Sequence, residues 1–128
     1  MEIEEYIRSY DNQPAIWGES DCSSWAAKWY ELATGNKPKL PTYTTRTEAH
    51  ELIEKAGGLV ALWDTALEGF GLERYGEPEL GDVGVIITKR FGDIGGIFGE
   101  RGLFFWRSEN GVAVLQPRTK TIKKIWCT

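Results

Sequence analysis

The first half of the chain repeats apolar positions at the spacing of helices. Apolar side chains recur at intervals of three and four residues, which places them on one face of a helix. This pattern predicts a short helix at the start, a second with Ser20 as its N-cap, a third over residues 47–56 and a fourth over residues 59–70. The apolar stripes are Ile3, Tyr6, Ile7 and Tyr10; Cys22, Trp25, Ala26, Trp29 and Ala33; Ala49, Leu52, Ile53 and Ala56; and Leu59, Leu62, Trp63, Ala66, Leu67 and Phe70.

The second half of the chain changes to short runs rich in β-branched and aromatic residues. Gly, Asn or Pro separates these runs, as is typical of strands joined by turns. Helices followed by strands indicate an α+β fold, in which N-terminal helices pack on an antiparallel β-sheet. We expect one domain over residues 1–128. Its expected strands cover residues 83–88, 94–98, 103–106, 112–115 and 121–126.

Composition and charge exclude several classes of protein. A net charge of −4 argues against a partner that is nucleic acid, because such binding relies on neutralising phosphates. The acidic start of the chain is unlike a signal peptide, and no apolar run approaches the roughly 20 residues that span a bilayer. Two cysteines are too few for a disulfide scaffold. We therefore expect a cytoplasmic protein with no membrane segment; a protein carried in a phage virion would have the same features.

Cys22 is the residue of greatest chemical interest. It falls in the first turn of a predicted helix, where the helix dipole and free amide groups stabilise a thiolate. A nucleophilic cysteine needs such a position and a base beside it. Cys22 is also in phase with Trp25 and Trp29, which equally fits a buried cysteine that only packs. Position alone leaves both interpretations open.

Two segments resemble a known family. Trp17-Gly18, followed by Asp21-Cys22 at the head of a helix, is similar to the nucleophile segment of NlpC-type cell-wall peptidases, which are papain-like cysteine hydrolases. Residues 81–87 resemble the Gly-Asp strand of that family, and residues 93–99 its histidine strand. The order of motifs along the chain also resembles an uncharacterised branch encoded among phage and prophage tail genes. The segments that fit that order are residues 14–35, 43–58, 81–99, 102–103 and Trp126.

The resemblance implies a single papain-like, NlpC-type domain in which Cys22 starts a helix that faces the strand of Asp93. Cys22 would be the nucleophile, and Asp93 occupies the position of the family's base histidine. Trp17, just before the cysteine helix, is a candidate wall of a groove and, with Asp21, a candidate binding residue.

The sequence differs from the family at the position of the base histidine, which is Asp93 here. The pKa of an ordinary aspartate is about 3.9 and that of a cysteine about 8.5, so moving the thiol proton to Asp93 would cost roughly 6 kcal/mol. The third polar residue of the family falls near Phe105 or Trp106, and neither side chain accepts a proton. Catalysis at Cys22 is therefore expected to be impaired.

Few other residues in the sequence indicate a base, a metal site or a cofactor site. His50, the single histidine, lies on the third predicted helix and is either a relocated base or an exposed surface residue. One histidine and two remote cysteines lack the spacing of a zinc site, so we expect no metal. The glycines around Asp93 do not form a nucleotide loop, so we expect no cofactor. Gly81-Asp82 is expected to form a turn before a strand.

Two functional hypotheses follow. The first is a phage tail-associated accessory or structural protein, a pseudoenzyme that binds a tail-tip protein or a cell-wall peptide. The second is an active cysteine hydrolase that cleaves peptidoglycan peptides, with Cys22 as nucleophile and His50 or Asp93 as base. The missing histidine favours the first, because a deficit of roughly 6 kcal/mol is large on the scale of catalytic effects.

Overall fold

The computed structural model describes residues 2–128 and shows an α+β domain, as predicted. The α-helices precede the strands along the chain, and the short 3-10 helices, labelled η, lie among the strands. Within the described residues no helix is long and apolar enough to cross a bilayer. The elements are α1 (Ile3–Ser9), α2 (Cys22–Thr34), α3 (Arg46–Ala56), α4 (Leu59–Ala66), β1 (Val83–Thr88), β2 (Gly92–Phe98), η1 (Glu100–Gly102), β3 (Phe104–Ser108), β4 (Gly111–Leu115), η2 (Thr119–Thr121) and β5 (Ile122–Trp126).

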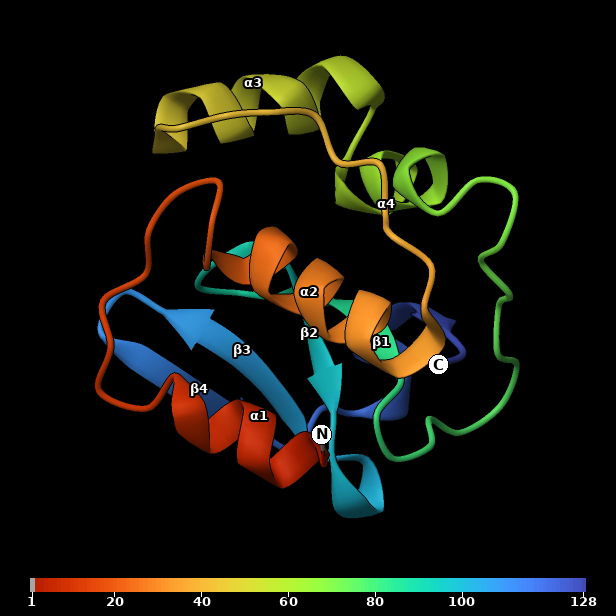
Figure 1. The fold of residues 1–128 in the computed structure, drawn as a ribbon. Helices are drawn as coiled ribbons and strands as arrows, with labels where there is room; N and C mark the ends of the chain where they lie inside the picture. Colours follow the sequence, from red (N-terminus) through yellow and green to blue (C-terminus); the bar gives the residue numbers. More distant parts are fainter. Residues whose placement is uncertain (1) are drawn as a thin grey trace.

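The strands form one antiparallel sheet in the order β4-β3-β2-β1-β5. In Figure 1, α2 crosses in front of the sheet, with α3 and α4 above it and α1 below. The predicted strand over residues 83–88 is confirmed in full, and the others differ from the structure by one or two residues at an end. This arrangement brings the start of α2 to the strands that follow it much later in the chain.

The alternation of side chains along the strands builds a core on both faces of the sheet. In β1, Val83 and Val85 face the helices, whereas Ile86 faces the opposite side. Tryptophans from α2 and α4 fill the cluster between helices and sheet. The second cluster comes from strands alone: Ile86, Ile94, Phe98, Phe104 and Ile125 are all buried in it.

Two predicted helix boundaries are wrong. The N-cap of α2 is Asp21 rather than Ser20, whose hydroxyl instead accepts a hydrogen bond from the amide of Ile16 (3.0 Å). The fourth helix ends at Ala66 rather than near Phe70. The apolar pattern continues beyond Ala66 because Phe70 still packs on the core through a series of turns, with its ring 5.9 Å from that of Tyr30.

The β5 edge of the sheet is covered by the segment that precedes β1. The amide of Arg74 donates to Ile125 (2.9 Å), and the amide of Cys127 donates to Leu72 (2.8 Å). An isolated bridge between Glu73 and Trp126 completes the pairing. β4 forms the opposite edge of the sheet.

Gly96 in β2 allows neighbouring strands to approach closely. A Cβ at this position would collide with the carbonyl oxygen of Phe105 and with the buried ring of Phe104. We predict that Gly96→Ala lowers the free energy of unfolding by about 3 kcal/mol, because neither the strand nor the ring can move freely. Gly92→Ala, in the same strand but with open space around it and a φ of 68°, should cost only about 1 kcal/mol. Urea denaturation of both variants measures the difference; equal losses would contradict the packing argument.

Candidate functional site

Cys22 is the first residue of α2, which confirms its predicted place in the first turn of a helix. The turn is capped by Asp21, whose carboxylate accepts hydrogen bonds from the amides of Ser23 (3.1 Å) and Ser24 (3.4 Å). These amides are among the free donors that make a helix N-terminus attractive to an anion. The cap therefore uses donors that would otherwise be available to a thiolate at Cys22.

Asp21 is a buried centre of hydrogen bonding. Besides the two helix amides, its carboxylate accepts from the amide of Gly18 (2.7 Å), the hydroxyl of Ser24 (2.8 Å) and the hydroxyl of Tyr43 (2.6 Å). Its side chain holds together the turn before α2, the start of α2 and the segment before α3. Asp21 was predicted as a binding residue; the structure shows that its oxygens are occupied within the protein.

Gly18 explains the Trp-Gly pair of the motif. Its φ is 85°, in the left-handed region that glycine tolerates, and a Cβ here would overlap the carbonyl oxygen of Tyr43. The glycine thus lets the turn before α2 lie directly against the segment before α3. The neighbouring Trp17 keeps 36% of its surface exposed, so it remains available to a partner.

The Cys22 thiol points at the main chain of β3. Its Sγ donates to the carbonyl oxygen of Arg107 (3.2 Å), which only the protonated thiol can do. Burial, and then the nearby charge of Asp21, raise the pKa of Cys22 to about 12. The raised pKa favours the neutral thiol at neutral pH. The sulfur is a hydrogen-bond donor here, not a prepared nucleophile.

Arg107 holds this corner of the molecule together. The side chain is 3% exposed, and its guanidinium donates to the carbonyl oxygens of Tyr10 (3.0 Å), Gln13 (3.0 Å), Ser20 (2.8 Å) and Gly111 (2.9 Å). The guanidinium also lies over the ring of Tyr10, 5.2 Å from its centroid. Arg107 was not among the residues that the sequence pointed to. Arg107 follows Phe105 by two residues in the strand, so both side chains lie on the face toward the helices. This spacing was the signal that could have indicated burial of Arg107.

Neither candidate base is hydrogen-bonded to the sulfur within the described residues. Asp93, near the start of β2, forms an ion pair with Lys123 (2.8 Å). His50 is exposed on α3. The register of β2 against β3 places Asp93 and Arg107 at the same end of the sheet. The helix α2 packs on both strands, and the hydrogen bond of the sulfur goes to β3.

Asp93 and His50 share a groove, here called the α3 groove. It has a volume of about 680 Å³ and lies between the C-terminal half of α3, the start of α4 and the start of β2. Isoleucine and leucine side chains and two glycines contribute apolar surface, and Glu54 adds a carboxylate. The residues that line it are His50, Ile53, Glu54, Gly57, Gly58, Leu59 and Asp93.

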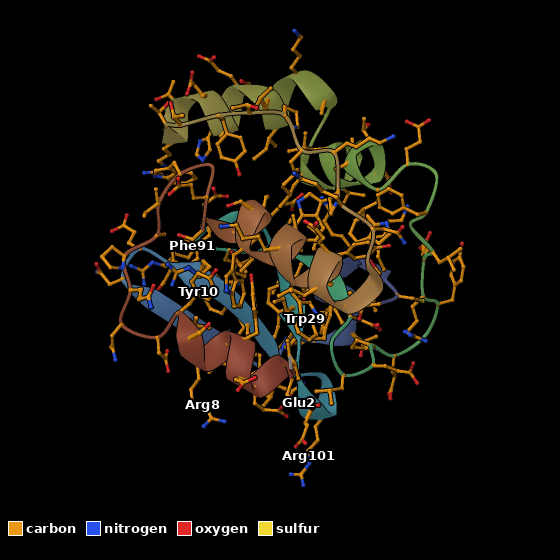
Figure 2. All side chains as sticks on the ribbon, viewed as in Figure 1. Glu2, Arg8, Tyr10, Trp29, Phe91 and Arg101 are labelled. Atoms are coloured by element: carbon orange, nitrogen blue, oxygen red, sulfur yellow. The ribbon has the colours of Figure 1, made fainter. Side chains whose placement is uncertain are left out.

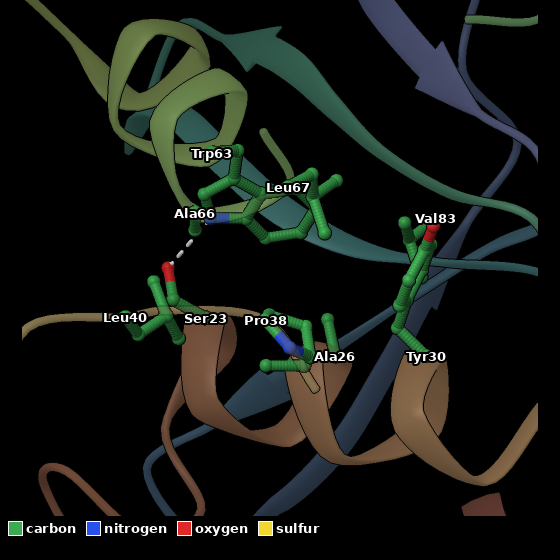
Figure 3. A pocket seen from close by; sticks show the side chains of 10 residues that line it. Ser23, Ala26, Tyr30, Pro38, Leu40, Trp63, Ala66, Leu67 and Val83 are labelled. Carbon is green, nitrogen blue, oxygen red and sulfur yellow. Dashed lines mark hydrogen bonds between the residues drawn. The ribbon is translucent and has the colours of Figure 1, made fainter. Parts of the chain in front are cut away.

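A smaller cavity lies behind the cysteine helix, between α2 and α4. Figure 3 shows Trp63 donating to the hydroxyl of Ser23 (3.0 Å) at one side of it. Its volume of about 20 Å³ corresponds to roughly one water molecule. Apolar side chains line most of it, so it belongs to the core rather than to a ligand site.

The predicted turn at Gly81-Asp82 is confirmed. Asp82 is 1% exposed and pairs with the guanidinium of Arg74. Its carboxylate also accepts from the amides of Glu79 (2.9 Å) and Thr128 (3.3 Å). These bonds join the turn before β1 to the chain after β5, which is a structural task.

Replacement of Arg107 should destabilise the protein strongly. Arg107→Met leaves several buried carbonyl oxygens without donors, so we expect a loss of about 3 kcal/mol or more in the free energy of unfolding. Arg8, which extends into solvent from α1 in Figure 2, provides the matched control. Arg8→Met should change stability by less than about 0.5 kcal/mol. Urea denaturation of both variants tests the difference, and a small loss at Arg107 would show that the clamp is dispensable.

Removal of the charge at position 21 should make the thiol more acidic. Asp21→Asn removes the negative charge beside the sulfur but leaves Cys22 buried. The pKa of Cys22 should therefore fall below about 12 while staying above the ordinary value of about 8.5. The weaker cap and the lost charged bond to Tyr43 should also cost about 1–2 kcal/mol of stability. The rate of alkylation of Cys22 against pH, in a Cys127→Ser background, measures the shift. An unchanged profile would show that Asp21 does not act on the sulfur.

Comparison with known proteins gives a family but no activity. Within residues 2–128, no cluster of three His, Cys, Asp or Glu side chains could hold a metal ion. A search of curated proteins finds no match. The family model described as Domain of unknown function (DUF6950) matches residues 1–127. Because the match covers almost the whole chain, the protein belongs to the DUF6950 family.

Proposed function

We propose that this chain is a papain-like, NlpC-type domain that has lost hydrolysis and serves as an accessory or structural protein of a phage tail. In this role it binds a tail-tip protein or a cell-wall peptide. The observation that carries the proposal is the Cys22 thiol, which donates to the carbonyl oxygen of Arg107 and has no base bound to it within residues 2–128.

The position of Cys22 supports the papain-like part of the proposal. The cysteine begins a helix that packs on an antiparallel sheet, and the motif strand that carries Asp93 is the next strand to β3. The resemblance implies this order of helix and strands, with the cysteine helix packed against the strand of Asp93, and α2 does pack on β2. The DUF6950 family itself carries no assigned function, so the support comes from motifs and geometry.

Three features of the Cys22 corner oppose hydrolysis. Burial and the charge of Asp21 hold the thiol neutral. The Asp21 carboxylate occupies first-turn amides that would stabilise a thiolate. Asp93, at the position of the base, is an acid paired with Lys123. A cysteine nucleophile needs a base and a low pKa, and this corner provides neither.

The α3 groove is the surface best suited to a bound peptide. It combines apolar walls with carboxylates and an imidazole, which suits an extended chain with polar groups. The exposed side chains of Ile16 (55%) and Trp17 (36%), in the turn before α2, offer additional apolar contact. Binding at these surfaces requires no proton transfer by Cys22.

One observation favours the alternative of an active hydrolase. His50 and Asp93 line the same groove, so an imidazole and a carboxylate are available together near the end of the sheet where α2 begins. For catalysis, His50 would have to approach the sulfur when a substrate binds, since apo geometry alone does not exclude a base. The alternative therefore predicts a reactive cysteine.

The reactivity of Cys22 separates the two functions. In a Cys127→Ser background, we predict that iodoacetamide modifies Cys22 at pH 7 at least about a hundredfold more slowly than an unstructured cysteine peptide. The rate should climb with pH beyond 8.5, because the thiolate is the reacting species and burial raises its pKa. Mass spectrometry of the modified protein measures the rate, and Cys22→Ala in the same background gives the blank.

An apparent pKa below 7 would contradict the proposal. So would release of peptides from purified peptidoglycan by the native protein but not by Cys22→Ala. Association of an epitope-tagged chain with purified phage tails, retained in Cys22→Ala, would support the structural role.

A further inference from the structure

The two edges of the sheet differ in their hydrogen bonding. Residues 72–74 pair with β5 and so cover that edge with main chain. Along the other edge, no strand or bridge within residues 2–128 pairs with the outer side of β4. An uncovered edge is a template for another strand, because its amides and carbonyls already have the right spacing.

The register of the β3-β4 hairpin identifies the free groups. Ser108 and Gly111 pair across a turn of two residues, and such a pair exchanges both of its hydrogen bonds. Bonded and non-bonded pairs then alternate, which turns the N–H and C=O groups of Val112 and Val114 away from β3. Within residues 2–128, none of these groups has a main-chain partner outside the helices and strands.

β4 lacks the features that usually protect an edge. Its sequence is Gly-Val-Ala-Val-Leu, with no lysine, no proline and no charge. Its pairing with β3 runs from Gly111 to Leu115 without a bulge. Val114 keeps 52% of its surface exposed beside the free main chain. Within the described residues, the edge is therefore unpaired and apolar from Val112 to Leu115. At its hairpin end the amide of Ala15 donates to Glu109 (2.9 Å) and Asn12 lies against Gly111.

We propose that β4 pairs antiparallel with β4 of a second copy of this chain, joining two sheets into one. With the two-fold axis at Ala113, Val112 lies opposite Val114 of the second copy, and Val114 lies opposite Val112 of the second copy. Every outward N–H and C=O of these valines then meets a partner. This isologous pairing is self-complementary, as a two-fold interface must be.

Charge favours a second copy over an unrelated peptide. The exposed Glu109 precedes β4, and the exposed Arg118 follows it. Antiparallel pairing brings the Glu109 end of one copy toward the Arg118 end of the other, so unlike charges flank the interface at both ends. The proposal concerns the outer edge of β4 and does not depend on the proposed function.

Sedimentation velocity over the micromolar range tests the proposal. We expect the native chain to pass with concentration from 14.4 kDa to twice that mass. Val114→Pro removes an outward N–H that β3 does not use, so it should weaken the dimer by about tenfold or more while the monomer stays folded. Val114→Thr retains the main-chain donor and should still dimerise. Circular dichroism spectra verify folding of both variants.

A charge exchange gives a second measurement in case the proline variant is poorly folded. Glu109→Arg should weaken the dimer, and the double variant Glu109→Arg with Arg118→Glu should restore it. A native chain that stays monomeric throughout this range would overturn the proposal. So would a dimer that persists in folded Val114→Pro, or a monomer whose edge binds only an extended peptide.

Discussion

The structure depends on a buried cation, Arg107, that has no carboxylate partner within residues 2–128. Arg107 lies on β3, yet its guanidinium binds the carbonyl oxygens of Tyr10, Gln13 and Ser20. Taking a guanidinium out of water is costly, and oriented carbonyl dipoles must offset that cost. The segment between α1 and α2 has little regular structure, so these bonds fix its path. The start of α2 is thereby anchored to the hairpin of β3 and β4.

The clamp also sets the chemistry of Cys22. While the Arg107 side chain binds the main chain before α2, its own carbonyl oxygen accepts the Cys22 thiol. The sulfur is therefore seated against a main-chain acceptor rather than an imidazole. A cysteine hydrolase would require a base beside the sulfur, whereas in this protein the neighbouring group on β3 is the carbonyl oxygen of Arg107. The same residue, Arg107, thus stabilises the corner and holds the cysteine in its protonated form.

The sequence predicted the elements better than the contacts between them. The run over 83–88 predicted boundaries that agree with the structure, because the preference of β-branched residues for strands acts locally. The end of α4 was wrong because Phe70 keeps the helical spacing after the helix has ended. The position of Cys22 at the first turn of α2 was correct. The hydrogen bond from Tyr43 to Asp21 was not predictable, because it joins residues that are 22 positions apart.

Arg107 shows most clearly why the rest was not predictable. A charged residue next to a Ser-Glu-Asn-Gly turn is normally exposed, and only tertiary contacts with residues more than eighty positions earlier bury it. Periodicity predicts the face of a strand on which a side chain lies, but it does not predict which carbonyl oxygens will accept its hydrogen bonds. The same limit applied to Asp93, whose ion pair with Lys123 depends on strands far apart in the sequence.

Competition at the start of α2 joins these observations into one argument. The first amides of a helix can stabilise one anion well, and in this protein Asp21 is that anion. A thiolate at Cys22 would have to share the same field with a buried carboxylate beside it, which raises its energy. In such a corner the cap stabilises the fold and disfavours a thiolate at Cys22. The structure shows Cys22 as a hydrogen-bonded residue whose thiol lies between the helix and β3.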